Sequence, residues 1–227
     1  VFNSSSPANC VITNVPTQTI GQLTVSNNRT VTISDVAGDG VSSTLSIGGA
    51  SGTDLQVDAG SSLIFDVSSA SLTDAIQVSL STGATASIAG TVSFSATPGG
   101  VRPHRLLAAD AAAITVTGTG MVKAMALSGN PFGNSLPQQT VVFNAGAVYE
   151  CYSGGDPFGL AAPASKVLFN SGSIYRHYAT TAPSIFGRTY ADFESYSAYT
   201  VSDGDASVMV ADNFKVLAGS AAITGAA

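Results

Sequence analysis

Charged side chains are scarce in this chain of 227 residues. Asp, Glu, Lys and Arg make up 10% of it, against about 25% in a typical soluble domain. Eight Lys and Arg stand against fourteen Asp and Glu, the net charge is −6, and the arginines are scattered. We therefore expect no nucleic-acid partner, which would need clustered positive charge. A surface of Ser, Thr, Asn, Gln and Gly suits packing against copies of itself or against sugars.

Long apolar runs are also missing. A membrane-spanning helix needs about 20 apolar residues, and the nearest run, 106–116, is interrupted by Asp110. We expect no membrane span. The chain starts at Val1 without an initiator Met or a signal-peptide pattern, so we expect that a targeting segment has been removed or that a longer chain is involved. The composition suits an extracellular bacterial protein.

Cysteine is limited to Cys10 and Cys151. The architecture predicted below places them about four coils apart, or ~19 Å at ~4.8 Å per coil. A disulfide needs a Cα separation under about 7 Å. We therefore predict no intramolecular bridge, and a bridge between copies is left open.

Groups suited to catalysis are equally sparse. There are two histidines, and His104, beside Arg102 and Arg105, is interpreted as part of a polar surface loop. The alternative is a polysaccharide lyase or hydrolase site within 102–110. No Gly-x-Ser-x-Gly elbow, Walker loop or HExxH motif occurs. The predictions are no enzyme, no catalytic residue and no cofactor.

Metal-binding patterns are faint. The segments 38–40 (Gly-Asp-Gly) and 203–205 (Asp-Gly-Asp) look slightly like calcium loops, but the Gly-Gly-x-Gly-x-Asp repeat of calcium-binding β-helices is absent. The acids at 54, 58, 66 and 74 are spread along predicted loops. We therefore predict no metal site.

What the sequence does contain is repetition. The segment 141–149 (VVFNAGAVY) recurs 26 positions later as 167–175 (VLFNSGSIY), and Pro-Phe-Gly at 131–133 recurs at 157–159. A weaker third copy places Phe193 and Tyr199 six residues apart. A fixed period of 20–50 residues indicates a solenoid, a propeller or an array.

From residue 20 onward, a short alternating strand, a turn and a second short strand recur. The turns fall near 27, 60, 83, 118, 146, 172, 196 and 219, where Gly or Asn supplies a positive φ. These features predict an all-β fold, a right-handed parallel β-solenoid (β-helix) of about seven to eight coils over 20–227, after an N-terminal arm or cap at 1–19. An antiparallel meander is the competing interpretation. Inserts are predicted near 96–113, with a short helix possible at 106–113, and near 180–190.

Aligned copies predict stacked side chains that point inward. One stack is Phe143, Phe169 and Phe193; a second is Tyr149, Tyr175 and Tyr199; a third is Cys151, His177 and Val201. His177 is then a core histidine, and the competing register would expose the tyrosines. Asn144 and Asn170 predict an amide ladder at the corners. Glu150 and Arg176 predict an exposed ion pair.

The segment 23–33 (LTVSNNRTVTI), together with 141–149 and its repeat, resembles the coils of large secreted bacterial β-helix proteins. These include adhesin-like surface proteins and cargo of the type IX secretion pathway. The resemblance covers most of the chain from about residue 20. It implies export, a right-handed parallel β-solenoid and a role at the cell surface, and it transfers no catalytic residues.

The predicted function is that of a non-enzymatic, extracellular structural protein. The segment 213–223 looks like the opening of another coil, which leaves a sheet edge able to pair with another chain. Copies of the chain, or a larger parent protein, are the predicted partners in a fibre or stalk, with the arm at 1–19 as a contact. The alternative is a carbohydrate-binding or adhesive module that contacts glycans through Tyr152 and Tyr178.

Overall fold

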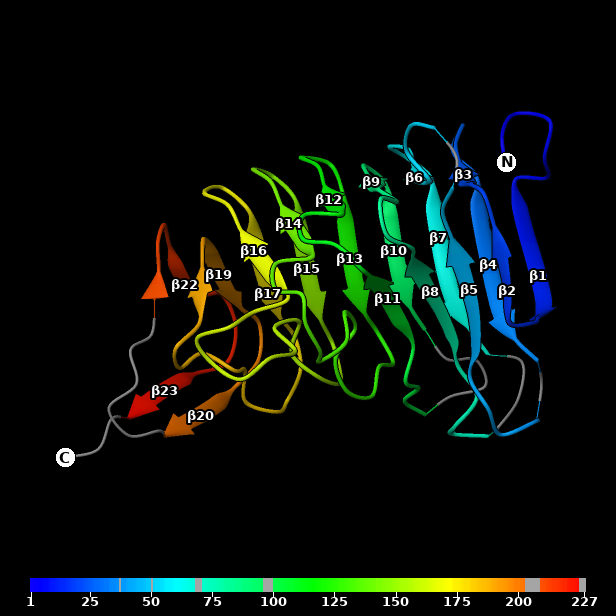
Figure 1. The fold of residues 1–227 in the computed structure, drawn as a ribbon. Helices are drawn as coiled ribbons and strands as arrows, with labels where there is room; N and C mark the ends of the chain where they lie inside the picture. Colours follow the sequence, from blue (N-terminus) through cyan, green and yellow to red (C-terminus); the bar gives the residue numbers. More distant parts are fainter. Residues whose placement is uncertain (37, 50, 68–70, 96–99, 203–208, 225–227) are drawn as a thin grey trace.

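The computed structural model describes residues 1–36, 38–49, 51–67, 71–95, 100–202 and 209–224. These residues form twenty-three β-strands and no helix. The strands lie side by side along the molecule, with the N-terminal strands at one end and the C-terminal strands at the other (Figure 1). The all-β prediction is confirmed. No described helix is long and apolar enough to cross a membrane.

Three parallel sheets hold most of the strands. The nine-stranded sheet, called the long sheet below, contains β1 (Asn9–Val15), β4 (Thr30–Asp35), β7 (Ser62–Asp66), β10 (Thr91–Phe94), β13 (Met121–Ala124), β15 (Val148–Cys151), β17 (Ile174–His177), β19 (Asp192–Ser195) and β22 (Phe214–Val216). The six-stranded sheet contains β3 (Leu23–Val25), β6 (Leu55–Val57), β9 (Ala86–Ile88), β12 (Ile114–Val116), β14 (Val141–Phe143) and β16 (Val167–Phe169). The four-stranded sheet contains β2 (Gln18–Ile20), β5 (Ser43–Ile47), β8 (Ile76–Leu80) and β11 (Arg105–Ala108).

Two smaller parallel pairs complete the fold near its C-terminal end. They are β18 (Thr189–Tyr190) with β21 (Met209–Val210), and β20 (Tyr199–Ser202) with β23 (Ala221–Thr224).

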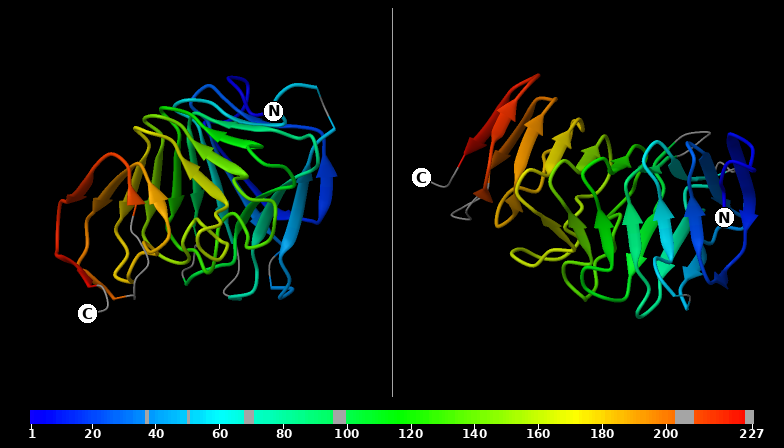
Figure 2. Two further views of the ribbon diagram at one scale, coloured as in Figure 1. Left: turned by 60° about the vertical axis from the view of Figure 1, so that its left-hand side comes forward. Right: turned by 90° about the horizontal axis from the view of Figure 1, so that it is seen from above.

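The chain visits the sheets in turn. As far as β12, each strand of a sheet pairs with the strand three places further along the chain, and the two views of Figure 2 show the resulting layers. Beyond β12 the four-stranded sheet ends, and the chain alternates between the other two sheets up to β17. Every named pair of strands is parallel, for example β4 with β7 and β15 with β17. The antiparallel meander is therefore wrong.

Alternation of apolar with polar residues produces these strands. In β6 and β7, Leu55, Val57, Leu63 and Phe65 are buried, and the residues between them are more exposed. The corners use residues with positive φ, including Asn27, Gly60, Gly83, Gly146 and Gly172, as predicted. A Cβ on Gly146 would lie 2.6 Å from the Gly118 carbonyl oxygen, so successive corners stack too closely for a side chain there.

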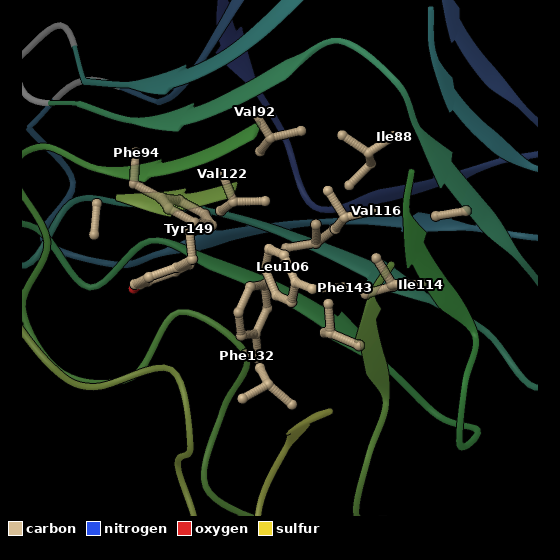
Figure 3. Close-up of a cluster of buried hydrophobic side chains, with 14 of the residues drawn as sticks. Ile88, Val92, Phe94, Leu106, Ile114, Val116, Val122, Phe132, Phe143 and Tyr149 are labelled. Carbon is tan, nitrogen blue, oxygen red and sulfur yellow. The ribbon is translucent and has the colours of Figure 1, made fainter. Parts of the chain in front are cut away.

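The core fills the space between the sheets. In Figure 3, Val92, Phe94 and Tyr149 from the long sheet face Ile88, Ile114, Val116 and Phe143 from the six-stranded sheet. Leu106 from β11 and Phe132 from the loop 125–140 close the third side. In the C-terminal half, where the four-stranded sheet has ended, the Pro-Phe-Gly loops cover the core on that side. Phe132 and Phe158 of these loops are both buried.

The predicted short helix within 106–113 is wrong. Residues Arg105–Ala108 form β11, which pairs in parallel with β8. Leu106 and Ala108 are buried, whereas Leu107 is only partly so. Residues 96–99 of this predicted insert lie outside the described part of the chain.

The N-terminal segment is joined to the sheets. β1 pairs in parallel with β4, and Phe2 forms a bridge with Val25. β2 spans the predicted boundary between residues 19 and 20. Cys10 lies in β1 and Cys151 in β15, which are five strands apart in the long sheet, and both are free thiols.

Candidate functional site: columns and edges of the long sheet

An aromatic column runs through the interior along the C-terminal half of the long sheet. Tyr149 pairs with Tyr175, Tyr175 with Phe193, and Phe193 with Phe214. The ring centroids of these successive pairs are 5.6, 5.2 and 5.1 Å apart. Tyr149, Tyr175 and Phe193 are buried, which agrees with the inward orientation of the tyrosines and not with the competing register.

The third sequence copy is stacked differently from the prediction. Phe143 lies on Phe169, with ring centroids 5.0 Å apart, but the ring above Phe169 belongs to Tyr190 rather than Phe193. The length of the corner between the two strands of a layer explains why Tyr190 takes this position. Four residues separate β16 from β17, whereas only Ala191 separates β18 from β19. Phe193 therefore continues the tyrosine stack, and Tyr199 lies in β20, outside the long sheet.

His177 is a buried core residue, as predicted. Its neighbours in register are Cys151 and Ser195, so Ser195 takes the place predicted for Val201. The Nε2–H of His177 donates to the Thr181 carbonyl, at 2.8 Å, and Nδ1 lies 3.4 Å from the Tyr175 hydroxyl. Burial lowers the pKa of His177, which keeps the ring neutral.

Cys151 and His177 line a cavity of about 150 Å³ together with Tyr175 and Asp156. A cysteine beside a histidine is the arrangement of a nucleophilic dyad. Here, burial raises the pKa of the Cys151 thiol to about 11. The thiolate is the reactive form, so this burial disfavours the nucleophilic state of Cys151 at neutral pH.

A ladder of alternating charges covers the outer face of the same strands. Glu150 accepts from Lys123 at 3.2 Å and from Arg176 at 3.3 Å. Glu194 accepts from Arg176 at 2.9 Å and from Lys215 at 3.5 Å. The predicted pair of Glu150 and Arg176 is therefore present, but Glu150 is buried rather than exposed. Burial favours the neutral form of Glu194, but Arg176 and Lys215 outweigh it and lower the pKa of this carboxyl.

A column of tyrosines stands beside the charge ladder. The rings of Tyr152 and Tyr178 have centroids 4.4 Å apart at an interplanar angle of 2°, and Tyr196 follows at 4.4 Å and 18°. The hydroxyls of Tyr152 and Tyr196 donate to Glu150 and Glu194. Tyr178 lies between the other two rings, so both of its faces are covered. Contact of Tyr152 and Tyr178 with glycans stays a prediction, and Tyr196 is a member of the column that sequence comparison missed.

The corner asparagines are bonded to each other. Asn170 Nδ2 donates to Asn144 Oδ1 at 2.9 Å. This bond joins equivalent corners of successive layers, as expected for an amide ladder.

Two of the residues singled out within 102–110 are buried in the structure. His104 is fully buried, so its assignment to a polar surface loop is wrong. Its Nε2–H donates to the Ser95 carbonyl at 2.9 Å, and its Nδ1 accepts from the Ile76 amide at 3.2 Å. Arg102 is also fully buried, whereas Asp110 accepts from the amide of the exposed Gly83. The histidine therefore joins β8 to the segment after β10 through backbone groups.

Three carboxylates meet near the faint calcium-like segment at 38–40. Oxygens of Asp35, Asp39 and Asp74 lie within 4.8 Å of one another. Asp74 accepts from the amides of Gly38 and Gly40, at 2.7 and 3.0 Å. Asp35 accepts from the amides of Val36, Ser43 and Ala75, and burial raises its pKa. The cluster therefore joins neighbouring loops through backbone bonds, and the absence of a metal site stays a prediction. Residues 203–205 lie outside the described part of the chain.

Asp74→Ala is expected to lower the free energy of unfolding by about 1–3 kcal/mol, because the amides of Gly38 and Gly40 lose a charged acceptor. Hydrogen exchange at the Gly38 and Gly40 amides should become faster. Asp39→Ala is the matched control, since Asp39 is exposed and accepts from Val41. Equal exchange rates at these two amides in wild type and Asp74→Ala would contradict the assignment.

The two edges of the long sheet are β1 and β22. At β22 the aromatic column ends in Phe214, which stacks on Phe193 and is 39% exposed. Val216, Leu217 and Ile223 are also exposed at this end. Comparison with family models, curated proteins and solved structures finds no match.

Proposed function

We propose that the chain is a right-handed parallel β-solenoid of about seven to eight coils that associates end to end, as a non-enzymatic structural element of an extracellular fibre or stalk. The observation that carries this proposal is the open edge at β22. Low charge and a surface rich in hydroxyl and amide groups support an extracellular structural role. The step of three strands along the chain supports the solenoid.

The edge at β22 exposes side chains of a kind that is buried elsewhere. Phe214 and Val216 occupy the inward positions of the long sheet, following Phe193 and Ser195 in register. They are 39% and 46% exposed, and β22 is the edge strand of this sheet among the described residues. Burying apolar surface contributes roughly 25 cal/mol per Å². An edge strand with unpaired backbone groups is also a template for another strand.

Backbone groups at β22 are open in the direction of the next layer. Phe193 donates to the Asn213 carbonyl, and Leu217 donates to the Ser195 carbonyl. In a parallel ladder, alternate residues bond to opposite neighbours. Asn213, Lys215 and Leu217 therefore face β19, and Phe214 and Val216 present their N–H and C=O groups to the open edge.

The opposite edge, at β1, has the complementary arrangement. Thr30 donates to the Ala8 carbonyl, so Ala8 and Cys10 face β4, and Asn9 and Val11 face the open edge. Cys10 pairs with Val31 on the inward side, and Val11 is 67% exposed on the outer side.

In one register, strand β1 of a second copy can pair with β22. If Phe214 pairs with Cys10 of the second copy, Val216 meets Ile12 inside and Lys215 meets Val11 outside. The backbone groups of Phe214 then reach those of Asn9 and Val11, which repeats the pattern that joins internal strands. The two edges differ, so the contact is head-to-tail. A head-to-tail contact extends into a filament when the rotation between copies does not close into a ring.

Cysteine cross-linking tests this register. In a Cys10→Ser background, Val11→Cys combined with Lys215→Cys should give a ladder of disulfide-linked oligomers under mild oxidation. Adjacent strands in a sheet lie about 4.7–4.9 Å apart, which is within the Cα separation of about 4.4–6.8 Å that a disulfide bridges. Sedimentation and electron microscopy of the unmodified chain should show concentration-dependent filaments.

The matched control pairs Val11→Cys with Lys123→Cys, because Lys123 lies on the same outer face in mid-sheet. It should give no ladder. Cross-linking no stronger than this control, with monomers at all concentrations, would overturn self-association. An edge protected by further coils in a longer polypeptide that stays monomeric would also overturn it.

A further inference from the structure

A cavity of about 170 Å³ lies beside β16, the last strand of the six-stranded sheet, at a point that the end-to-end contact does not use. Phe158, Phe169 and Leu168 form its apolar walls, and Gln139, Ser165 and Arg188 are among its polar residues. The cavity therefore combines a carbon-lined surface with a permanent positive charge.

Among the described residues, Arg188 is a buried charge without a carboxylate beside it. The residue is 6% exposed, and its Nη1 and Nη2 donate to the carbonyls of Ala164 and Leu160. Its Nε has no hydrogen-bond partner. The guanidinium lies 4.8 Å from the centroid of the Phe158 ring. Among the described residues, no Asp or Glu comes within salt-bridge distance of Arg188. Two carbonyls and a ring face are weak compensation for a full charge.

Lys166 provides an internal comparison. Lys166 directly precedes β16, just as Arg188 directly precedes β18. Lys166 Nζ donates to the carbonyls of Ser135 and Pro137, at 3.0 and 2.8 Å. Each cation therefore joins its strand to the preceding loop. Arg188 differs because its guanidinium also lines the cavity and has five N–H groups to satisfy.

The cavity lies where the sheet is interrupted. Val141 donates to the Lys166 carbonyl and Asn170 donates to the Phe143 carbonyl, so Lys166 and Asn170 face β14. By the alternation of a parallel ladder, the N–H of Phe169 points the other way, toward the cavity side. β18, which follows on that side, pairs with β21 rather than with β16. The Ser165 hydroxyl bonds to both backbone groups of Val167, so this part of the edge is already satisfied.

We infer that this cavity binds small organic carboxylates, with Arg188 as the charged partner. A carboxylate can accept from the N–H groups of Arg188 that Ala164 and Leu160 leave unused, and charge-assisted bonds of this kind are stronger than neutral ones. The Phe169 N–H supplies a second donor on the same side. Phe158, Phe169 and Leu168 contact the carbon skeleton of the ligand, so an acid with an apolar face, such as a sugar acid, fits better than a bare anion.

Titration with galacturonate, followed by two-dimensional NMR of the backbone amides, tests this inference. Saturable shifts should appear at Phe169 and Arg188, and galactose, the neutral sugar, should give none. Arg188→Gln should weaken binding about tenfold or more, because the charge-assisted bonds are lost.

Arg188→Gln also removes the bonds by which Arg188 joins two loops. A second variant is therefore needed that keeps the guanidinium. Leu168→Glu places a carboxylate at the mouth of the cavity and should abolish the shifts by competition. Leu72→Glu, at an exposed leucine in the N-terminal half, is the matched control and should bind as wild type does. Equal shifts with galactose, stronger binding of inorganic phosphate than of galacturonate, or unchanged binding in Leu168→Glu would each overturn the inference.

Discussion

Lowering the pH from 7 to 5 is expected to reduce the free energy of unfolding by about 2 kcal/mol through His104 alone. Burial of the ring, the largest cause, lowers the pKa of His104 from 6.5 to about 4. In the unfolded chain the same ring takes up a proton near pH 6.5. The unfolded state therefore binds protons first, and stability falls as the pH drops from 6.5 toward 4.

The pKa of His177 is also lowered by burial, so it acts in the same direction. Asp35 acts in the opposite direction, because burial raises its pKa and the folded state takes up that proton first. Its effect belongs to the more acidic range, since the ordinary pKa of the group is 3.8.

Urea unfolding at pH 7, 6 and 5 measures the slope. In His104→Gln, which cannot take up a proton, the decrease between pH 7 and 5 should shrink by about 2 kcal/mol, even if the variant is less stable at pH 7. An unchanged pH slope in His104→Gln would show that the histidine is not the cause.

Tyr175→Ala is expected to lower the free energy of unfolding by about 3–5 kcal/mol, the usual range for removing a buried aromatic ring. Tyr175 stacks between Tyr149 and Phe193 and makes edge contacts with Phe169 and Tyr190. Its removal leaves a cavity in the middle of the column and takes the hydroxyl away from His177 Nδ1.

Tyr178→Ala is the matched control, because Tyr178 is the same residue type three positions away on the outer face. It stacks on Tyr152 and Tyr196 but is only partly buried, so its removal should cost about 1–2 kcal/mol. Equal losses in the two variants would mean that the inner column contributes no more than the outer one. Denaturant midpoints at neutral pH provide the comparison.

Side chains that stack on their own equivalents could be predicted from the sequence. The nonapeptides at 141–149 and 167–175 differ little, so their alignment placed Tyr149 against Tyr175 and Asn144 against Asn170. The third layer could not be predicted in the same way. Its corner is shortened to Ala191, and the six-residue spacing of Phe193 and Tyr199 imitates the earlier copies without sharing their geometry.

The other differences between the predictions and the structure arise from contacts between layers. Arg105–Ala108 contains two adjacent leucines, so its sequence does not alternate, although its burial does. His104 is accommodated in the core only because the Ser95 carbonyl and the Ile76 amide meet its two nitrogens. Likewise, the carboxylates of Asp35 and Asp74 are 39 positions apart in the chain and meet only in the fold. Sequence patterns within one layer contain no information about such partners.

The order of strands in the long sheet has a mechanical consequence. β1 and β22 are its opposite edges, so tension between them acts across the strands and loads the hydrogen bonds of one strand pair at a time. The protein would yield by peeling, layer after layer, rather than by shearing all pairs together. Tyr149 and Tyr175 are equivalent positions of adjacent layers, so peeling this layer would release the 26 residues between them, or about 90 Å of chain. A filament built from such units would extend under load in increments and keep its remaining layers intact.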